Sequence, residues 1–98
     1  MAHKKVIWSV RAGLELKENL EFYLERNGNP NYSIKFLEEI EELIQTLSKS
    51  HFIGRLTSNK ITRVIPMDVY LIFYEIQKEQ IEIVSFWDNR QDQLMRIT

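Results

Sequence analysis

Near residue 60 the spacing of the apolar residues changes, and this change decides which fold class the chain can adopt. Before it, apolar side chains recur every three or four residues, which is the period of a helix with one buried face. After it they alternate or run continuously, which is the pattern of strands. This order predicts an α+β domain in which helices pack on a sheet. The 98 residues suffice for one such domain, spanning residues 1–98.

The N-terminal part predicts a strand followed by a helix. Residues 4–8, KKVIW, are rich in β-branched and aromatic side chains, which favour a strand. Ser9 can cap the helix that follows, and we expect this helix to reach about Arg26. Its apolar face consists of Leu16, Leu20, Tyr23 and Leu24.

The segment RNGNPN, residues 26–31, predicts a tight turn between two helices. Gly28 can adopt the left-handed conformation that ends a helix. Asn29 can cap the next helix and Pro30 suits its first position. We expect the second helix to continue to about Lys49. Because the connection is so short, the two helices should form an antiparallel hairpin.

Three strands are predicted after a loop at residues 48–60, and they span residues 60–65, 69–76 and 81–87. A turn at Pro66-Met67-Asp68 and another at residues 77–80 would join them as an antiparallel meander. Alternatively, Pro66 lies at a strand end where no backbone donor is needed. The middle strand, VYLIFYEI, is nearly all apolar, which favours a central strand covered on both faces. The helical hairpin can cover only one sheet face well, so we expect a partner on the other.

The predicted core combines the inner faces of the helices with the last two strands. It consists of Leu20, Leu24, Phe36, Leu37, Ile40, Leu43, Ile44, Leu47, Leu71, Phe73, Ile83 and Val84.

Composition excludes several classes of protein. Without cysteine there is no disulfide or thiolate chemistry, which fits the cytoplasm. We find no signal peptide and no apolar stretch that could span a membrane. The three glycines are isolated, and His3 and His51 lie far apart, so we expect neither a phosphate loop, a metal nor a cofactor. His51 is interpreted as a capping or surface residue.

Charge is unevenly distributed on a chain whose net charge is −1. Residues 1–13 and 51–66 carry basic side chains and no acids, so a basic face can form locally. Arginine can clamp a phosphate, and aromatic residues can stack on bases. The residues that could serve these roles are Arg55, Lys60, Arg63, Arg90, Tyr70, Tyr74 and Trp87. An alternative is that the tyrosines are plain strand residues and that Arg90 pairs with Asp88 or Asp92.

Several segments, taken in order, resemble the RelE/ParE superfamily of type II toxin–antitoxin toxins, also called plasmid stabilization proteins. They are VIWSVRA, LIQTL, IGR at residues 53–55, TRVI, VYLIFYEI and IEIVSFWDNRQD. The tail of this group often runs DxRQDP, and Gln93 stands here in place of the proline. The resemblance implies a small cytoplasmic toxin neutralised by a cognate antitoxin. It leaves open a homodimer or a toxin–antitoxin hetero-oligomer.

The resemblance implies two alternative activities. A ParE-like toxin binds DNA gyrase, whereas a RelE-like toxin is a metal-independent endoribonuclease that cuts mRNA on the ribosome. A decayed toxin that only binds antitoxin is a third alternative. The implied site residues are, for catalysis, Arg63 and Arg90, and, for target binding, Arg55, Lys60 and Trp87. The strand at residues 69–76 has no basic residue, and the tail QDQLMRIT has no tyrosine or histidine, so the ParE-like alternative is favoured.

Overall fold

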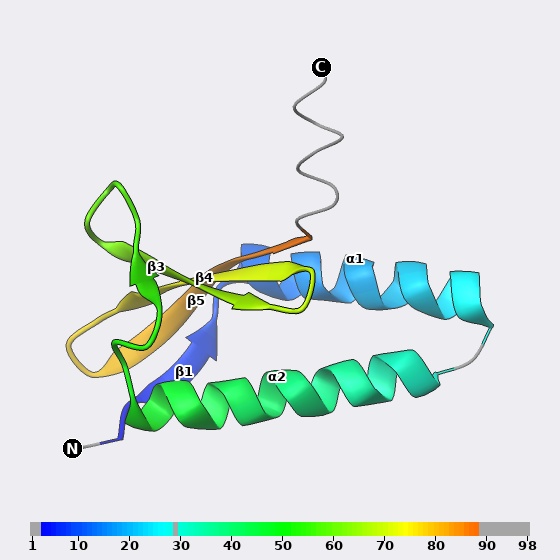
Figure 1. Ribbon diagram of the computed structural model, residues 1–98, viewed down its shortest axis with the longest axis horizontal. Helices are drawn as coiled ribbons and strands as arrows, with labels where there is room; N and C mark the ends of the chain where they lie inside the picture. The colour runs from blue at the N-terminus through cyan, green and yellow to red at the C-terminus, as the bar shows by residue number, and fades with distance from the viewer. Residues whose placement is uncertain (1–2, 29, 89–98) are drawn as a thin grey trace.

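The computed structural model describes residues 3–28 and 30–88, which form two helices and one mixed sheet (Figure 1). The α+β class predicted from the apolar spacing is confirmed. The elements are, in chain order, β1 (Lys5–Trp8), α1 (Val10–Asn27), α2 (Asn31–Lys49), β2 (Arg55–Leu56), β3 (Thr62–Met67), β4 (Tyr70–Ile76) and β5 (Gln80–Asp88). The strand order in the sheet is β1-β5-β4-β3-β2, and β4 is therefore the central strand.

The ends of α1 follow the predicted capping. The Ser9 hydroxyl accepts a hydrogen bond from the Ala12 N–H at 3.0 Å. Gly28 has φ 72°, and its N–H donates to the Leu24 carbonyl at 3.0 Å. Helix α2 begins at Asn31, one residue later than expected, because Pro30 is its N-cap and no side chain caps it. Asn29, the predicted cap, lies outside the described residues.

The sheet differs from the predicted meander at its two edges. Strand β1 pairs in parallel with β5, with Lys5 opposite Gln80 and Trp8 opposite Ile83. The predicted loop contains the short strand β2, which pairs with β3. Strand β3 also continues through Pro66 to Met67, which agrees with Pro66 at a strand end, and the turn is later than expected, at Asp68 with φ 57°. Proline is tolerated at this position because β2 ends before it and its missing N–H costs no ladder bond.

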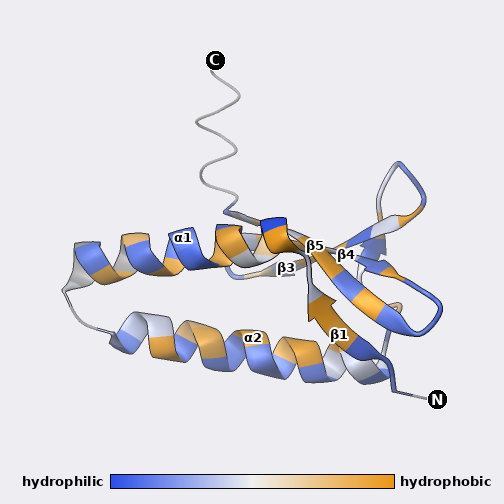
Figure 2. Cartoon of the chain, turned by 180° about the vertical axis from the view of Figure 1, so that it is seen from behind, coloured by the Kyte–Doolittle hydropathy of each residue, from blue (hydrophilic) through white to orange (hydrophobic). Residues whose placement is uncertain are grey.

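The α1–α2 hairpin covers one face of the sheet and extends beyond it (Figures 1 and 2). Phe36, Ile40, Leu47 and Ile83 are buried as predicted. The remaining buried apolar residues include Ala12, Val64, Ile65, Tyr70, Ile72, Tyr74, Ile81 and Phe86. Leu20, Leu43 and Ile44 are half-buried against this core.

Five predicted core residues are not in the core. Leu24 and Leu37 are exposed. Leu71, Phe73 and Val84 are only half-buried. Side chains alternate along a strand, and β4 directs Tyr70, Ile72 and Tyr74 toward the helices, which leaves Leu71 and Phe73 on the opposite face. The expectation that β4 is covered on both faces is therefore wrong.

A β-bulge in β5 fixes the position of α1. Phe73 pairs with Ser85 and Tyr74 pairs with Ile83, so β5 has one additional residue between them. Beyond the bulge, the Glu15 carboxylate of α1 accepts hydrogen bonds from the Phe86 N–H at 3.0 Å and from the Ser85 hydroxyl at 3.1 Å. This carboxylate satisfies a backbone donor past the end of β1 and anchors α1 to β5.

Candidate functional site

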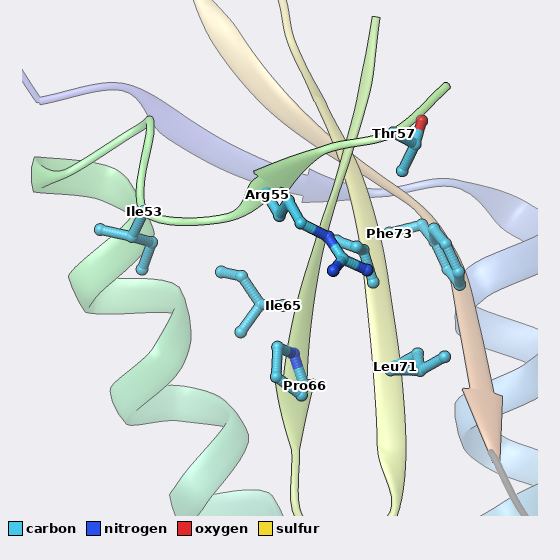
Figure 3. A pocket seen from close by; sticks show the side chains of 8 residues that line it. Ile53, Arg55, Thr57, Ile65, Pro66, Leu71 and Phe73 are labelled. Atoms are coloured by element: carbon cyan, nitrogen blue, oxygen red, sulfur yellow. The ribbon is translucent and has the colours of Figure 1, made fainter. Parts of the chain in front are cut away.

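A groove lies on the sheet face that the helices leave open (Figure 3). Its volume is about 510 Å³, and β2, β3 and β4 supply most of its lining. The lining residues are Ile53, Arg55, Thr57, Val64, Ile65, Pro66, Leu71 and Phe73. Cross-strand partners share a sheet face, and Val64 is opposite Phe73 and Pro66 opposite Leu71. The floor of the groove is therefore apolar.

Arg55 is the basic residue of the groove. It is opposite Val64 in the β2–β3 ladder, and its side chain extends from β2 across β3 (Figure 3). The side chain is exposed, and among the described residues no hydrogen bond or ion pair engages its guanidinium. Its charge is thus available to a ligand in the groove.

The tyrosines of β4 are buried under the helices and cannot stack on a ligand. The Tyr74 hydroxyl donates to the His51 carbonyl at 2.7 Å and accepts from the Gly54 N–H at 2.9 Å. Burial raises the pKa of Tyr74, opposed by the Gly54 hydrogen bond and the Arg63 charge. Burial likewise raises the pKa of Tyr70, assisted by the Tyr32 hydroxyl 3.3 Å away. Both tyrosines are structural.

His51 is buried, so of its two interpretations the surface residue is wrong, and the capping residue agrees with its contact to the last turn of α2. Its Nε2 lies 3.0 Å from the Ser48 carbonyl oxygen at the end of α2. Together with the Tyr74 hydroxyl, this contact holds the chain in place as it leaves the helix and approaches β2.

Arg63 lies on the sheet face opposite to Arg55. It is paired with Tyr74 in β4, on the side that the helices cover. Its Nη1 donates to the Gly54 carbonyl at 2.7 Å, and its Cζ lies 5.0 Å from the centre of the Phe52 ring. These contacts hold the loop before β2, and they separate Arg63 from the groove.

Lys60 lies at the tip of the connection between β2 and β3, with φ 63° and an exposed side chain. Asn59 organises this turn. Its Oδ1 accepts hydrogen bonds from the Ile61 and Thr62 N–H groups, each at 2.8 Å, and its Nδ2 donates to the Thr62 hydroxyl at 2.9 Å. Lys60 is therefore presented to solvent on an ordered turn.

Trp87 is half-buried and lies opposite Leu71 in the β4–β5 ladder. It borders a second hollow, which it shares with Glu18 and Phe22 of α1. Asp88, which follows it, is buried and opposite Tyr70. Arg90 and Asp92 lie outside the described residues, so both interpretations of Arg90 stay predictions.

The structure thus separates the residues that were predicted to act together. Arg55 and the Leu71–Trp87 pair share the open face, Lys60 lies at a turn, and Arg63 is on the covered face. The groove residues missed as candidates include Leu71 and Phe73, which the apolar pattern assigns to the core. The signal available was the alternation of β4, in which one set of residues must face away from the helices.

Two further observations concern the described residues. No three histidine, aspartate or glutamate side chains among them come together as a metal site would require. Neither of their helices is long and apolar enough to cross a membrane.

Comparisons with known proteins identify a family by sequence and a similar fold by structure. The family model of the ParE toxin of the type II toxin–antitoxin system parDE matches residues 6–93. A solved chain of the chromosomal ParDE system from P. aeruginosa has the same fold, with a TM-score of 0.75 and 17% sequence identity. The match covers 88% of this chain and 96% of that chain. No curated protein matches the sequence significantly.

Proposed function

This chain belongs to the ParE toxin family of type II toxin–antitoxin systems, and we propose on that basis that it is a cytoplasmic toxin that acts by binding DNA gyrase. A cognate antitoxin neutralises it in a hetero-oligomer. The match to the family model over residues 6–93 is the observation that carries this proposal.

The state of the described polar groups supports binding rather than RNA cleavage. Besides free basic side chains, which Arg55 and Lys60 could supply, a nuclease of this fold needs a group that transfers protons. Arg63 is occupied by the Gly54 carbonyl, and the Tyr74 hydroxyl and the His51 ring are buried and hydrogen-bonded to backbone. None of these three groups is available to a substrate in this arrangement.

The free end of the helical hairpin offers a surface for the antitoxin. Apolar side chains exposed there are Phe22, Leu24, Ile34 and Leu37. Figure 2 shows that apolar residues continue along both helices where they extend past the sheet. An antitoxin segment that folds on binding can cover such residues with an amphipathic helix. Contiguous exposed apolar surface of this kind commonly marks an interaction site.

Two assays run side by side test the activity. Purified protein is added to a DNA gyrase supercoiling reaction, and cellular mRNA is analysed by primer extension after the protein is induced. Inhibition of supercoiling without new mRNA ends supports the proposal. New ends within codons, with supercoiling unaffected, would instead indicate the RelE-like endoribonuclease. Inactivity in both assays would indicate a decayed toxin.

Co-expression with the product of the neighbouring open reading frame tests neutralisation. We expect a complex that co-purifies and a host that grows normally. Growth arrest that persists in the presence of every adjacent gene product would contradict the antitoxin part of the proposal.

Arg90 has a test of its own, although it lies outside the described residues. If it faces the target, Arg90→Ala abolishes growth arrest while the protein still folds and still binds antitoxin. If it only pairs with an aspartate, the change costs about 0–1 kcal/mol and growth arrest is unaffected. We propose the first outcome, and growth curves after induction distinguish the two.

A further inference from the structure

The lining of the open-face groove combines an apolar floor with a single cation. Pro66, Leu71 and Phe73 form the floor, and Arg55 is the one charged residue of the lining. A volume of about 510 Å³ lies within the range of sites that hold a ligand's side chains or rings. The chemistry of these residues therefore determines which class of ligand the groove can bind.

A nucleic acid strand fits this lining poorly. Its backbone carries a charge at every nucleotide, so proteins that bind it track the strand with several lysines and arginines. Here Arg55 stands alone in the groove, because Arg63 is turned to the other face of the sheet and is bound to the Gly54 carbonyl. Aliphatic residues such as Leu71 and Pro66 suit the side chains of a protein instead.

Arg55 also specifies the charge of the ligand. A purely apolar segment on the floor would cover the guanidinium and remove it from water without compensation, which is costly. A carboxylate on the same segment would instead form a charge-assisted pair with it, and such a pair is strengthened beside apolar surface. The groove thus selects for an acid and against neutral segments.

The groove is held in shape at both ends of β2. Before β2, the Tyr74 hydroxyl and Arg63 fix Gly54 from two sides. After β2, Asn59 fixes the turn to β3 through the Ile61 and Thr62 N–H groups. A site that is already ordered loses little conformational freedom when a ligand binds.

We propose that this groove binds a peptide segment of the toxin's target protein, with apolar side chains on Pro66, Leu71 and Phe73 and with a carboxylate paired to Arg55. The inference rests on the proposed function, since it names the surface through which the toxin engages its target. It also predicts that the target contributes an acidic residue beside apolar ones.

Selection of peptides from a random octapeptide phage library on the full chain tests the proposal. We expect enriched sequences that combine apolar residues with aspartate or glutamate. One enriched peptide is then synthesised with a fluorescent label, together with a partner in which asparagine or glutamine replaces the acid. Fluorescence anisotropy should show binding of the acidic peptide that is at least about tenfold tighter.

Substitutions in the groove test which of its residues bind the peptides. Arg55→Gln should weaken the acidic peptide by about tenfold and should not weaken the neutral partner. Leu71→Ser should weaken both peptides. Lys78→Gln removes an exposed charge in the β4–β5 turn and should change neither. Circular dichroism melts of each variant establish that it is folded.

Several results would overturn the proposal. These are selection of no peptide, selection of peptides without an acid, equal binding to Arg55→Gln, and tighter binding of an octauridylate RNA than of the acidic peptide. Growth arrest is measured in cells that express each variant, and gyrase inhibition is measured with the same purified proteins. A wild-type protein that inhibits gyrase but selects no acidic peptide refutes the groove alone, whereas acidic peptide binding without gyrase inhibition refutes the proposed target alone.

Discussion

Gly54 shows at the scale of one residue why the loop before β2 tolerates so little change. A Cβ at this position would lie 2.7 Å from both Cε1 and the hydroxyl oxygen of Tyr74, and 3.0 Å from the Ile65 side chain. Tyr74 is fully buried, so its ring has no space to move away from the added methyl group. Gly54→Ala should therefore destabilise the protein by about 1–3 kcal/mol. Urea denaturation measures this change.

Gly13 provides the matched control for that substitution. It lies in α1, and a Cβ there meets no atom within 4 Å. Gly13→Ala should stabilise the protein by up to about 1 kcal/mol, because alanine loses less freedom in a helix. If both variants shifted the urea midpoint in the same direction, close packing around Gly54 would not be the cause.

The buried tyrosines predict how stability depends on pH. Burial raises the pKa of Tyr70 and of Tyr74 above the value of 10.0 for a free tyrosine. Below that value both are protonated whether the chain is folded or unfolded, so their contribution is fully present. Above it the unfolded chain releases protons that the folded protein keeps, and stability falls by about 1.4 kcal/mol per pH unit for each group.

Urea denaturation at pH about 9 and about 11 measures this loss. Tyr70→Phe should make the fall smaller, because one of the two groups no longer titrates. A spectroscopic titration of the folded protein should show fewer phenolates than its four tyrosines. Ionisation of all four below the unfolding transition would contradict the burial argument.

At the scale of elements, two residues of helix α2, Ile40 and Leu37, test which face of the helix is buried. Ile40 is 4% exposed, whereas Leu37, which the apolar pattern also assigned to the core, is 43% exposed. Ile40→Ala should destabilise the protein by about 2–5 kcal/mol. Leu37→Ala should cost less, since 43% of its surface stays in water after folding. Equal urea midpoints for the two variants would contradict the assigned helix faces.

Helix ends could be predicted because their signals are local, whereas the pairing of β1 with β5 joins segments far apart in the chain. Ser9 and Gly28 form hydrogen bonds with backbone groups three or four residues away, so their capping roles can be predicted from the sequence. The orientation of β4 could not be predicted, because every residue from Tyr70 to Tyr74 is apolar. Which set faces the helices depends on the ladder with β5 and on its bulge. This is why Leu71 and Phe73 were assigned to the core.

The candidate site was predictable only in its residue types. Arg55 and Arg63 both belong to the basic segment after α2, and nothing in their spacing says that they lie on opposite faces. The pairing of β2 with β3 decides this, since it places Val64 opposite Arg55 and Leu56 opposite Arg63. Strand β2 has two residues, which is too short for an apolar pattern to reveal.

At the scale of the whole molecule, the two proposed surfaces lie apart. The free end of the helical hairpin is at one end of the long axis, and β2 and β3 lie toward the other (Figure 1). Antitoxin binding and target binding can therefore be altered separately, since substitutions that are distant and share no partners act independently.

A pair of variants tests this separation. Ile34→Asp combined with Leu37→Asp places charges on the hairpin surface, where both side chains are exposed and folding should be little affected. This variant should arrest growth even when antitoxin is co-expressed, and should no longer co-purify with it. Arg55→Gln should show the reverse, with antitoxin binding retained and growth arrest lost. Because each variant keeps the activity that the other loses, neither result can be attributed to misfolding. Simultaneous loss of both activities in a variant whose thermal melt matches that of the wild type would mean that antitoxin and target share one surface, and that neutralisation is direct competition for it.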